Sequence, residues 1–230
     1  MFFDWTYLVI VFPFVILAMW AQAKVQTTYA KYSTFKSVRA MTAETAVRRI
    51  LDANGLNHIT ITRVQGNLTD HYDPRSKTVN LSDSVYNSNS VAAAAVAAHE
   101  CGHALQHALE SAPLQMRSAL VPIVSFSSRW VTWILLGGIL LLETFPSLLL
   151  VGIILYGLTT LFSFVTLPVE INASTRAIAW LEQAGITNSE TTPMAATALR
   201  SAAYTYVVAA LASLGTLIYY ISIFLGGRRN

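Results

Sequence analysis

Five consecutive residues in the middle of the chain have the types and spacing of a catalytic metal site. They read His99-Glu100-Cys101-Gly102-His103, the pattern HExxH. On a helix the two histidines lie one turn apart, about 6 Å along the axis, so both imidazoles can reach one ion. Zinc binds such nitrogens and lowers the pKa of a water, whose proton an adjacent glutamate can accept. The pattern predicts one Zn²⁺ bound by His99 and His103, with Glu100 as general base; the alternative is a helix face with hydrogen-bonded histidines.

A catalytic zinc ion needs a third protein ligand, and Glu170 is the best candidate. It ends an apolar segment, where a carboxylate needs a positive partner; the alternative is a glutamate that pairs with Arg176 or faces solvent. His107 is a poorer choice, because it would lie about 12 Å from His99 along a straight helix. Ser174, four residues after Glu170 on the same helical face, could orient the carboxylate.

The remaining polar candidates have weaker arguments. His71 lies in the polar stretch 70–73, and a histidine near zinc could stabilise the oxyanion of a tetrahedral intermediate. The alternative for this stretch is a polar hairpin loop. Asn172 and Arg176 are candidates for contacts around the ligands or the substrate. Cys101 is turned away from the faces of both histidines, so we do not expect it to bind the ion.

The elements around the motif can be read from periodicity. The motif belongs to an alanine-rich helix over 91–110. Its small side chains would allow other helices to approach it closely. An amphipathic pattern predicts a second helix over 42–54. Alternating residues over 58–64 and 77–81, with turn residues over 73–77 between them, predict a small antiparallel sheet. The expected caps and stops are Thr42, Gly55, Ser88 to Ser90 and Pro113.

The composition argues against a freely soluble globular domain and favours a membrane protein. Of 230 residues, 54% are hydrophobic and 12% charged, about half the charged share of a soluble domain. Four segments are apolar and long enough to span a bilayer. The first reads as a retained helix, with a cleaved signal peptide as the alternative. A net charge of +3 gives no argument for nucleic acid, and a single cysteine excludes an internal disulfide. The expected spans are 5–23, 126–142, 147–167 and 204–225.

Lysine and arginine positions predict the orientation. Four spans place both termini on one side and the segments 24–125 and 168–203 together on the other. Most of the positive charges near the spans lie in these two segments, whereas Arg228 and Arg229 lie on the opposite side. The bias therefore predicts that the motif faces the cytoplasm.

Three long stretches resemble the YugP-type membrane zinc metallopeptidases of bacteria. They are LTDHYDPRSKTVNLS (68–82), VYNSNSVAAAAVAAHECGHALQH (85–107) and LPVEINASTRAIAWL (167–181). The resemblance implies a neutral zinc peptidase with His99, His103 and Glu170 as ligands and Glu100 as base. The chain is also distantly similar to the heat-shock-type membrane metalloproteases, whose third ligand opens an ExxAD pattern. Here Ser174 replaces the aspartate.

The expected protein is mainly α: a four-helix transmembrane bundle with a small α+β extramembrane part that carries the HExxH zinc helix, similar to gluzincins. We expect a single integral membrane domain in the bacterial plasma membrane that hydrolyses protein or peptide substrates by metal-activated water, in membrane-protein or peptide turnover. One alternative is an intramembrane protease whose motif helix crosses the bilayer. The other is a non-enzymatic scaffold with a structural zinc, which would need a fourth protein ligand.

Overall fold

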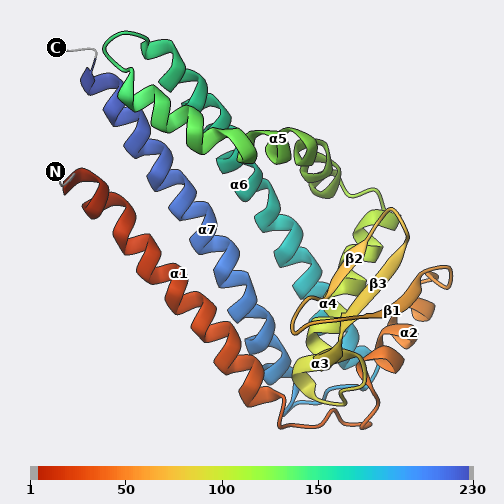
Figure 1. The fold of residues 1–230 in the computed structure, drawn as a ribbon. Coiled ribbons are helices and arrows are strands. Elements are labelled where there is room, and N and C mark those ends of the chain that lie inside the picture. The colour runs from red at the N-terminus through yellow and green to blue at the C-terminus, as the bar shows by residue number, and fades with distance from the viewer. Residues whose placement is uncertain (1–4, 228–230) are drawn as a thin grey trace. The chain divides into compact units, whose positions relative to one another are not determined.

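The structure is a computed structural model that describes residues 5–227, so Arg228 and Arg229 lie outside the described residues. The chain is mainly helical, with one small sheet (Figure 1). The helices are α1 (Trp5–Tyr32), α2 (Ala43–Ala53), α3 (Asp83–Tyr86), α4 (Val91–Ala108), α5 (Ala112–Leu140), α6 (Pro146–Gln183) and α7 (Thr192–Gly227). The strands are β1 (Thr60–Val64), β2 (His71–Asp73) and β3 (Thr78–Ser82).

Four of the described helices are long and apolar enough to cross a membrane, namely α1, α5, α6 and α7. Each expected span lies almost wholly within one of these helices, but all four helices extend well outside the expected apolar segment. α5 begins at Ala112 and contains Pro122, and α6 continues through Pro168 to Gln183. Helical hydrogen bonds propagate cheaply once a helix has formed, so polar residues after a span can remain helical. Glu170 therefore lies within a continuous helix.

The described chain divides into two compact units. The first, here called the apolar unit, comprises residues 5–21, 115–167 and 205–227. The second, the motif unit, comprises residues 22–114 and 168–204. Each unit is formed by separate stretches of the chain, and the expected single domain stays a prediction.

Small side chains bring the helices of the apolar unit close together. A Cβ atom at Gly138 of α5 would lie 2.5 Å from the Cα atom of Leu149 in α6. Thr160 of α6 and Ser213 of α7 are joined by a hydrogen bond of 2.7 Å between their hydroxyls. Glycine contacts and interhelical hydroxyl pairs are typical of helices that pack within a bilayer.

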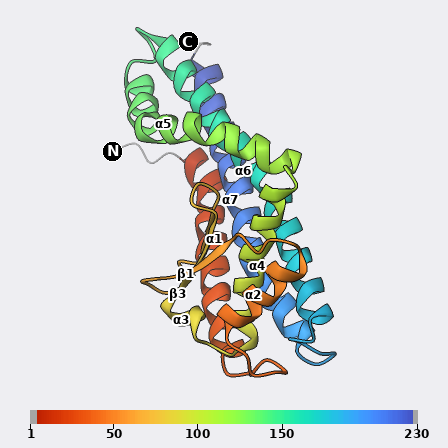
Figure 2. The same ribbon diagram turned by 90° about the vertical axis from the view of Figure 1, so that its right-hand side faces the viewer.

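The sheet of the motif unit has the strand order β1-β3-β2 and lies beside α4 (Figures 1 and 2). The expected turn over 73–77 joins β3 to a short strand that was not expected, β2, and these two strands pair antiparallel with His71 opposite Asn80. β1 pairs in parallel with β3, with Thr60 opposite Thr78, so the expected antiparallel pairing of these two segments is wrong. The reason is β2, which lies between β1 and β3 in the sequence but at the edge of the sheet. It reverses the chain direction once more, so β1 and β3 point the same way.

Local signals set the ends of the two helices predicted in this unit. The Thr42 hydroxyl accepts a hydrogen bond from the backbone of Thr45 at the start of α2, and Gly55 takes a φ of +72° just after its end. The Ser90 hydroxyl accepts a hydrogen bond from the backbone of Ala93 at the start of α4. α4 ends at Ala108, two residues before the expected end.

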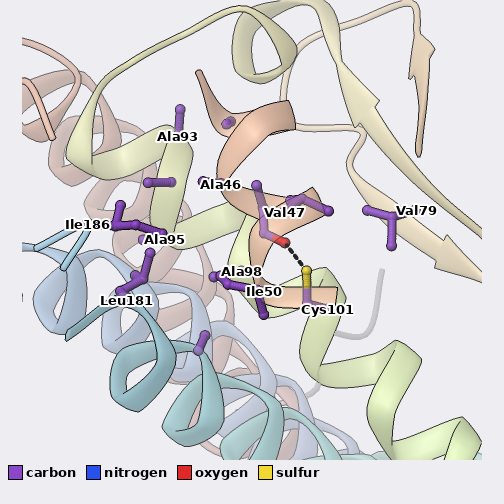
Figure 3. Close-up of a cluster of buried hydrophobic side chains, with 14 of the residues drawn as sticks. Ala46, Val47, Ile50, Val79, Ala93, Ala95, Ala98, Cys101, Leu181 and Ile186 are labelled. Carbon is purple, nitrogen blue, oxygen red and sulfur yellow. Dashed lines mark hydrogen bonds between the residues drawn. The ribbon is translucent and has the colours of Figure 1, made fainter. Parts of the chain in front are cut away.

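The core of the motif unit surrounds α4. Figure 3 shows side chains of α2, among them Val47 and Ile50, facing Ala98 and Cys101 of α4, with Leu181 nearby. All five side chains are buried. The alanines of α4 let its neighbours approach closely on several sides, so most of this helix is buried. The motif therefore lies on a helix that is packed within the core of the unit.

Candidate metal centre

Three side chains converge in the motif unit: His99 and His103 from α4, and Glu170 from α6. The Nε2 atom of His99 lies 3.2 Å from Oε2 of Glu170, and Nε2 of His103 lies 3.6 Å from the same oxygen. One donor atom from each residue lies within 4.8 Å of the other two. Among residues 5–227 this is the one histidine, cysteine or carboxylate group with such spacing. The site thus offers two nitrogens and one oxygen to a single point.

The close approach of α4 and α6 brings Glu170 to the histidines. A Cβ atom at Gly102 would lie 2.8 Å from both the Cα and the backbone oxygen of Ala173. Only glycine fits a contact in which a helix touches the backbone of its neighbour. Glu170 lies three residues before Ala173, about one turn earlier on α6. Gly102, between the two histidines, therefore sets the depth at which the carboxylate meets them.

Each imidazole makes a second contact through its other nitrogen. Nδ1 of His99 lies 3.0 Å from the hydroxyl of Ser174, and Nδ1 of His103 lies 3.0 Å from Oε1 of Gln106. In both rings Nε2 is the nitrogen that faces Glu170. Such outer contacts orient histidines that bind metals.

The three side chains of this group are buried or nearly buried, and one of them is a carboxylate. The Glu170 side chain is 3% exposed, and the side chains of His99 and His103 are 14% and 13% exposed. Burial alone would lower the pKa of His103, but the hydrogen bond that His103 donates to Glu170 and the charges of Glu100 and Glu170 outweigh this effect and raise the pKa. A buried carboxylate is costly unless positive charge lies beside it. A divalent cation would supply that charge.

Glu100 differs from Glu170 in having no partner. It is buried at 7% exposure, yet its carboxylate makes no hydrogen bond or ion pair with any residue between 5 and 227. The nearby Asp70 carboxyl, which feels the negative charge of Glu100, has its pKa raised, first by its own burial. Among the described residues, the Glu100 carboxylate thus has no hydrogen-bond donor committed to it.

The donor set and its spacing fit zinc. With bonds of about 2.0–2.1 Å, two ligands of a tetrahedral zinc ion lie roughly 3.3 Å apart. The two nitrogen-to-oxygen distances in the structure, 3.2 and 3.6 Å, lie on either side of this value. Two imidazoles and one carboxylate are also a known catalytic set, which leaves a fourth position for water.

The other predicted residues divide into those near this group and those apart from it. Asn172 accepts hydrogen bonds from Gln106 and from Arg176, so both predicted residues belong to the contacts behind His103. His71 is exposed, and its Nδ1 atom lies 2.9 Å from the backbone oxygen of Thr69. The oxyanion role of His71 stays a prediction.

The two residues set aside as ligands also lie apart from the group. His107 is exposed and contacts the Tyr72 hydroxyl at 3.0 Å. Cys101 is buried, its thiol faces the backbone oxygen of Ala97, and burial raises its pKa. A high thiol pKa disfavours the thiolate that would bind a metal.

Gln106 is the residue that sequence reasoning missed. It is 2% exposed and lies three residues after His103 and seven after His99. Residues at these intervals share one face of a helix. This spacing could have identified Gln106 from the sequence. A polar residue on the same face as the two histidines of an alanine-rich helix needs a hydrogen-bond partner.

Two comparisons with known proteins identify relatives over nearly the whole chain. The family described as "Putative neutral zinc metallopeptidase" matches residues 7–225. A protein of Bacillus subtilis (strain 168), "Putative membrane protease YugP", is 42% identical over 212 residues, which cover 92% of this chain and 93% of the relative. No solved structure matches the chain significantly.

Proposed function

The chain belongs to the neutral zinc metallopeptidase family, and from this premise we propose that it is a membrane-embedded, zinc-dependent endopeptidase. The observation that carries the proposal is the convergence of His99, His103 and Glu170 within 4.8 Å. The resulting His₂Glu set is of the gluzincin type. Four long apolar helices support a multi-pass membrane protein. The bacterial plasma membrane and a cytoplasmic site remain part of the proposal, the latter from the positions of lysine and arginine.

The zinc ligands in this proposal are the Nε2 atoms of His99 and His103 and a carboxylate oxygen of Glu170. When bound, zinc would polarise the scissile carbonyl and make a water molecule more acidic. The three ligands come from two helices in close contact, so the chain holds them in place before the ion arrives. Ser174 and Gln106 hold the outer nitrogens of the two rings.

Glu100 is the proposed general base. Its carboxylate accepts a proton from the attacking water, whose oxygen forms a bond to the peptide carbonyl carbon. The carbon–nitrogen bond then breaks, and Glu100 returns the proton to the leaving amine. The absence of any hydrogen bond from the described residues to this carboxylate supports the role.

The sheet supports a binding mode for an extended substrate. β2 contacts α4, and its outer edge is unpaired within the described residues. A peptide could add there as a further strand through main-chain hydrogen bonds. Proline scanning of a cleaved peptide tests this step, since proline removes one backbone donor at each position. Cleavage indifferent to proline at every position near the cut would contradict it.

Both alternatives receive less support from the described residues. An intramembrane protease would need α4 to cross the bilayer, yet α4 is not among the candidate spans and lies in the core of the motif unit. A structural zinc site needs a fourth protein ligand. Within residues 5–227 the group has three members, and Cys101 is turned away from it.

The deciding experiment measures zinc content and casein cleavage for the purified protein and three variants. Glu100→Gln should keep zinc and lose about 10²–10⁴-fold in cleavage rate, because it removes the base but no ligand. Glu170→Ala should lose both zinc and cleavage. Glu182→Ala is the matched control, since it removes an exposed glutamate from the same helix and should change neither.

Two outcomes would contradict the proposal. If Glu170→Ala retained full zinc, the third ligand would be wrong. If Glu100→Gln cleaved casein as fast as the wild type, the base would be wrong even with zinc in place.

A further inference from the structure

The Gln106 side chain uses both of its polar atoms between the two ligand-bearing helices. Oε1 lies 3.0 Å from Nδ1 of His103, while Nε2 donates to the backbone oxygen of Val169 at 2.8 Å. Nε2 also donates to Oδ1 of Asn172 at 3.1 Å. Val169 directly precedes Glu170, so one amide contacts a proposed ligand and the backbone beside another.

The orientation of this amide follows from its partners. Val169 offers a backbone oxygen, which can only accept, so the NH₂ end of Gln106 must face α6. Asn172 presents its oxygen to the same NH₂ group, because Arg176, which can only donate, donates to that oxygen at 2.9 Å. If the Gln106 amide were flipped, its oxygen would face the oxygens of Val169 and Asn172, and none of the three could donate a hydrogen bond. Oε1 therefore has to face His103.

This orientation determines the tautomer of His103. An oxygen facing Nδ1 requires that Nδ1 carry the proton, which leaves Nε2 unprotonated in the neutral ring. Nε2 is the atom 3.6 Å from Glu170. His99 is not constrained in this way, because its Nδ1 partner is the Ser174 hydroxyl, which can donate or accept.

We propose that Gln106 is a positioning residue, which fixes His103 in the tautomer that binds zinc through Nε2 and joins that ring to the backbone that presents Glu170. The inference rests on the proposed zinc site and adds a residue that acts through its ligands. Because the amide is buried and fully hydrogen-bonded, the arrangement exists before metal binding and lowers the cost of ordering His103.

The test compares zinc affinity in Gln106→Leu and Cys101→Ala, each stripped of metal and titrated against a competing chelator. Gln106→Leu keeps the volume but removes all three hydrogen bonds, and its zinc dissociation constant should rise about 10–100-fold. Cys101→Ala removes a buried side chain from the same helix that contacts no ligand, so it should change the constant less than about threefold. Melting curves of the metal-free variants show whether each is folded.

A second measurement does not depend on a variant. In the zinc-loaded wild type, ¹⁵N spectra of the histidine rings should show His103 protonated on Nδ1 and coordinated through Nε2. Coordination through Nδ1, or an unchanged zinc affinity in folded Gln106→Leu, would overturn the inference while leaving the zinc site intact. A wild type that binds no zinc would instead contradict the proposed function.

Discussion

The buried carboxylates of Glu170 and Asp70 in the motif unit have different kinds of partner. Glu170 lies between two imidazoles, whereas Asp70 accepts hydrogen bonds from the backbone and hydroxyl of Ser82 at 2.8 and 2.9 Å. No cation forms an ion pair with Asp70 in the described part of the chain. Burial raises its pKa, the hydrogen bonds from Ser82 oppose that shift, and the charge of Glu100 adds to it. The net direction is upward, so the folded protein favours the protonated form.

This shift predicts a pH-dependent stability difference between the wild type and Asp70→Asn. Between the ordinary value of 3.8 and the raised native pKa, the native state binds more protons at Asp70 than the unfolded state does. The wild type therefore loses stability as the pH rises through this range, and Asp70→Asn does not. The melting temperature of the metal-free variant, relative to the wild type, should rise from acid to neutral pH and then level off. A difference that stays constant from about pH 3 to 8 would contradict the raised pKa.

At the scale of elements, the site depends on the contact between α4 and α6. Two features of α4 act together: its caps and alanine-rich faces fix the helix, and Gly102 allows the backbone of Ala173 to lie against it. A displacement of α6 by the width of one methyl group would move Glu170 out of reach of the histidines. We therefore expect metal binding to be coupled to helix packing.

Gly102→Ala tests this coupling. The added methyl group should destabilise the metal-free protein by about 1–3 kcal/mol and weaken zinc binding, because α6 must move away. Gly157→Ala in α6 is the matched control, since its Cβ would meet no atom within 4 Å, and it should be neutral or stabilising. Adding Ala173→Gly should not restore zinc binding, because the clash involves the backbone of residue 173. Full recovery of zinc binding in the double variant, or unchanged zinc binding in Gly102→Ala, would contradict a direct contact between Gly102 and the backbone of residue 173.

At the scale of the whole molecule, the four apolar helices determine which segments share a side of the membrane. With four spans, the β2–β3 turn and the α6–α7 loop lie on the same side, and the α5–α6 turn lies on the other. If α4 crossed the membrane as well, three crossings would separate the first two segments and place them on opposite sides.

Single cysteines in a Cys101→Ala background distinguish these topologies. The positions are Arg75, Ser189 and Glu143, all exposed, one in each of the three connecting segments. Arg75→Cys and Ser189→Cys should react with an impermeant maleimide only after the cells are permeabilised, and Glu143→Cys should react in intact cells. If Arg75→Cys and Ser189→Cys differed in labelling, four spans would be wrong; if both reacted in intact cells, the cytoplasmic orientation would be wrong.

Local patterns were enough to predict much of this protein. The apolar segments, the helix that carries His99, Glu100 and His103, and the Thr42 and Ser90 caps all follow from residues close together in the chain. Such features depend on helical periodicity and on transfer from water, which act over one or a few turns. The family, too, was apparent from contiguous stretches.

Only the tertiary structure decided what depends on residues far apart. The parallel pairing of β1 with β3 required an intervening strand too short to be recognised from its three residues. The distances from Glu170 to the two histidines, and the bonds from Gln106 to Val169 and Asn172, join positions more than 60 residues apart. Their geometry is set by how closely two helices pack, and that closeness depends on side-chain volume at Gly102, which has no signature in local sequence.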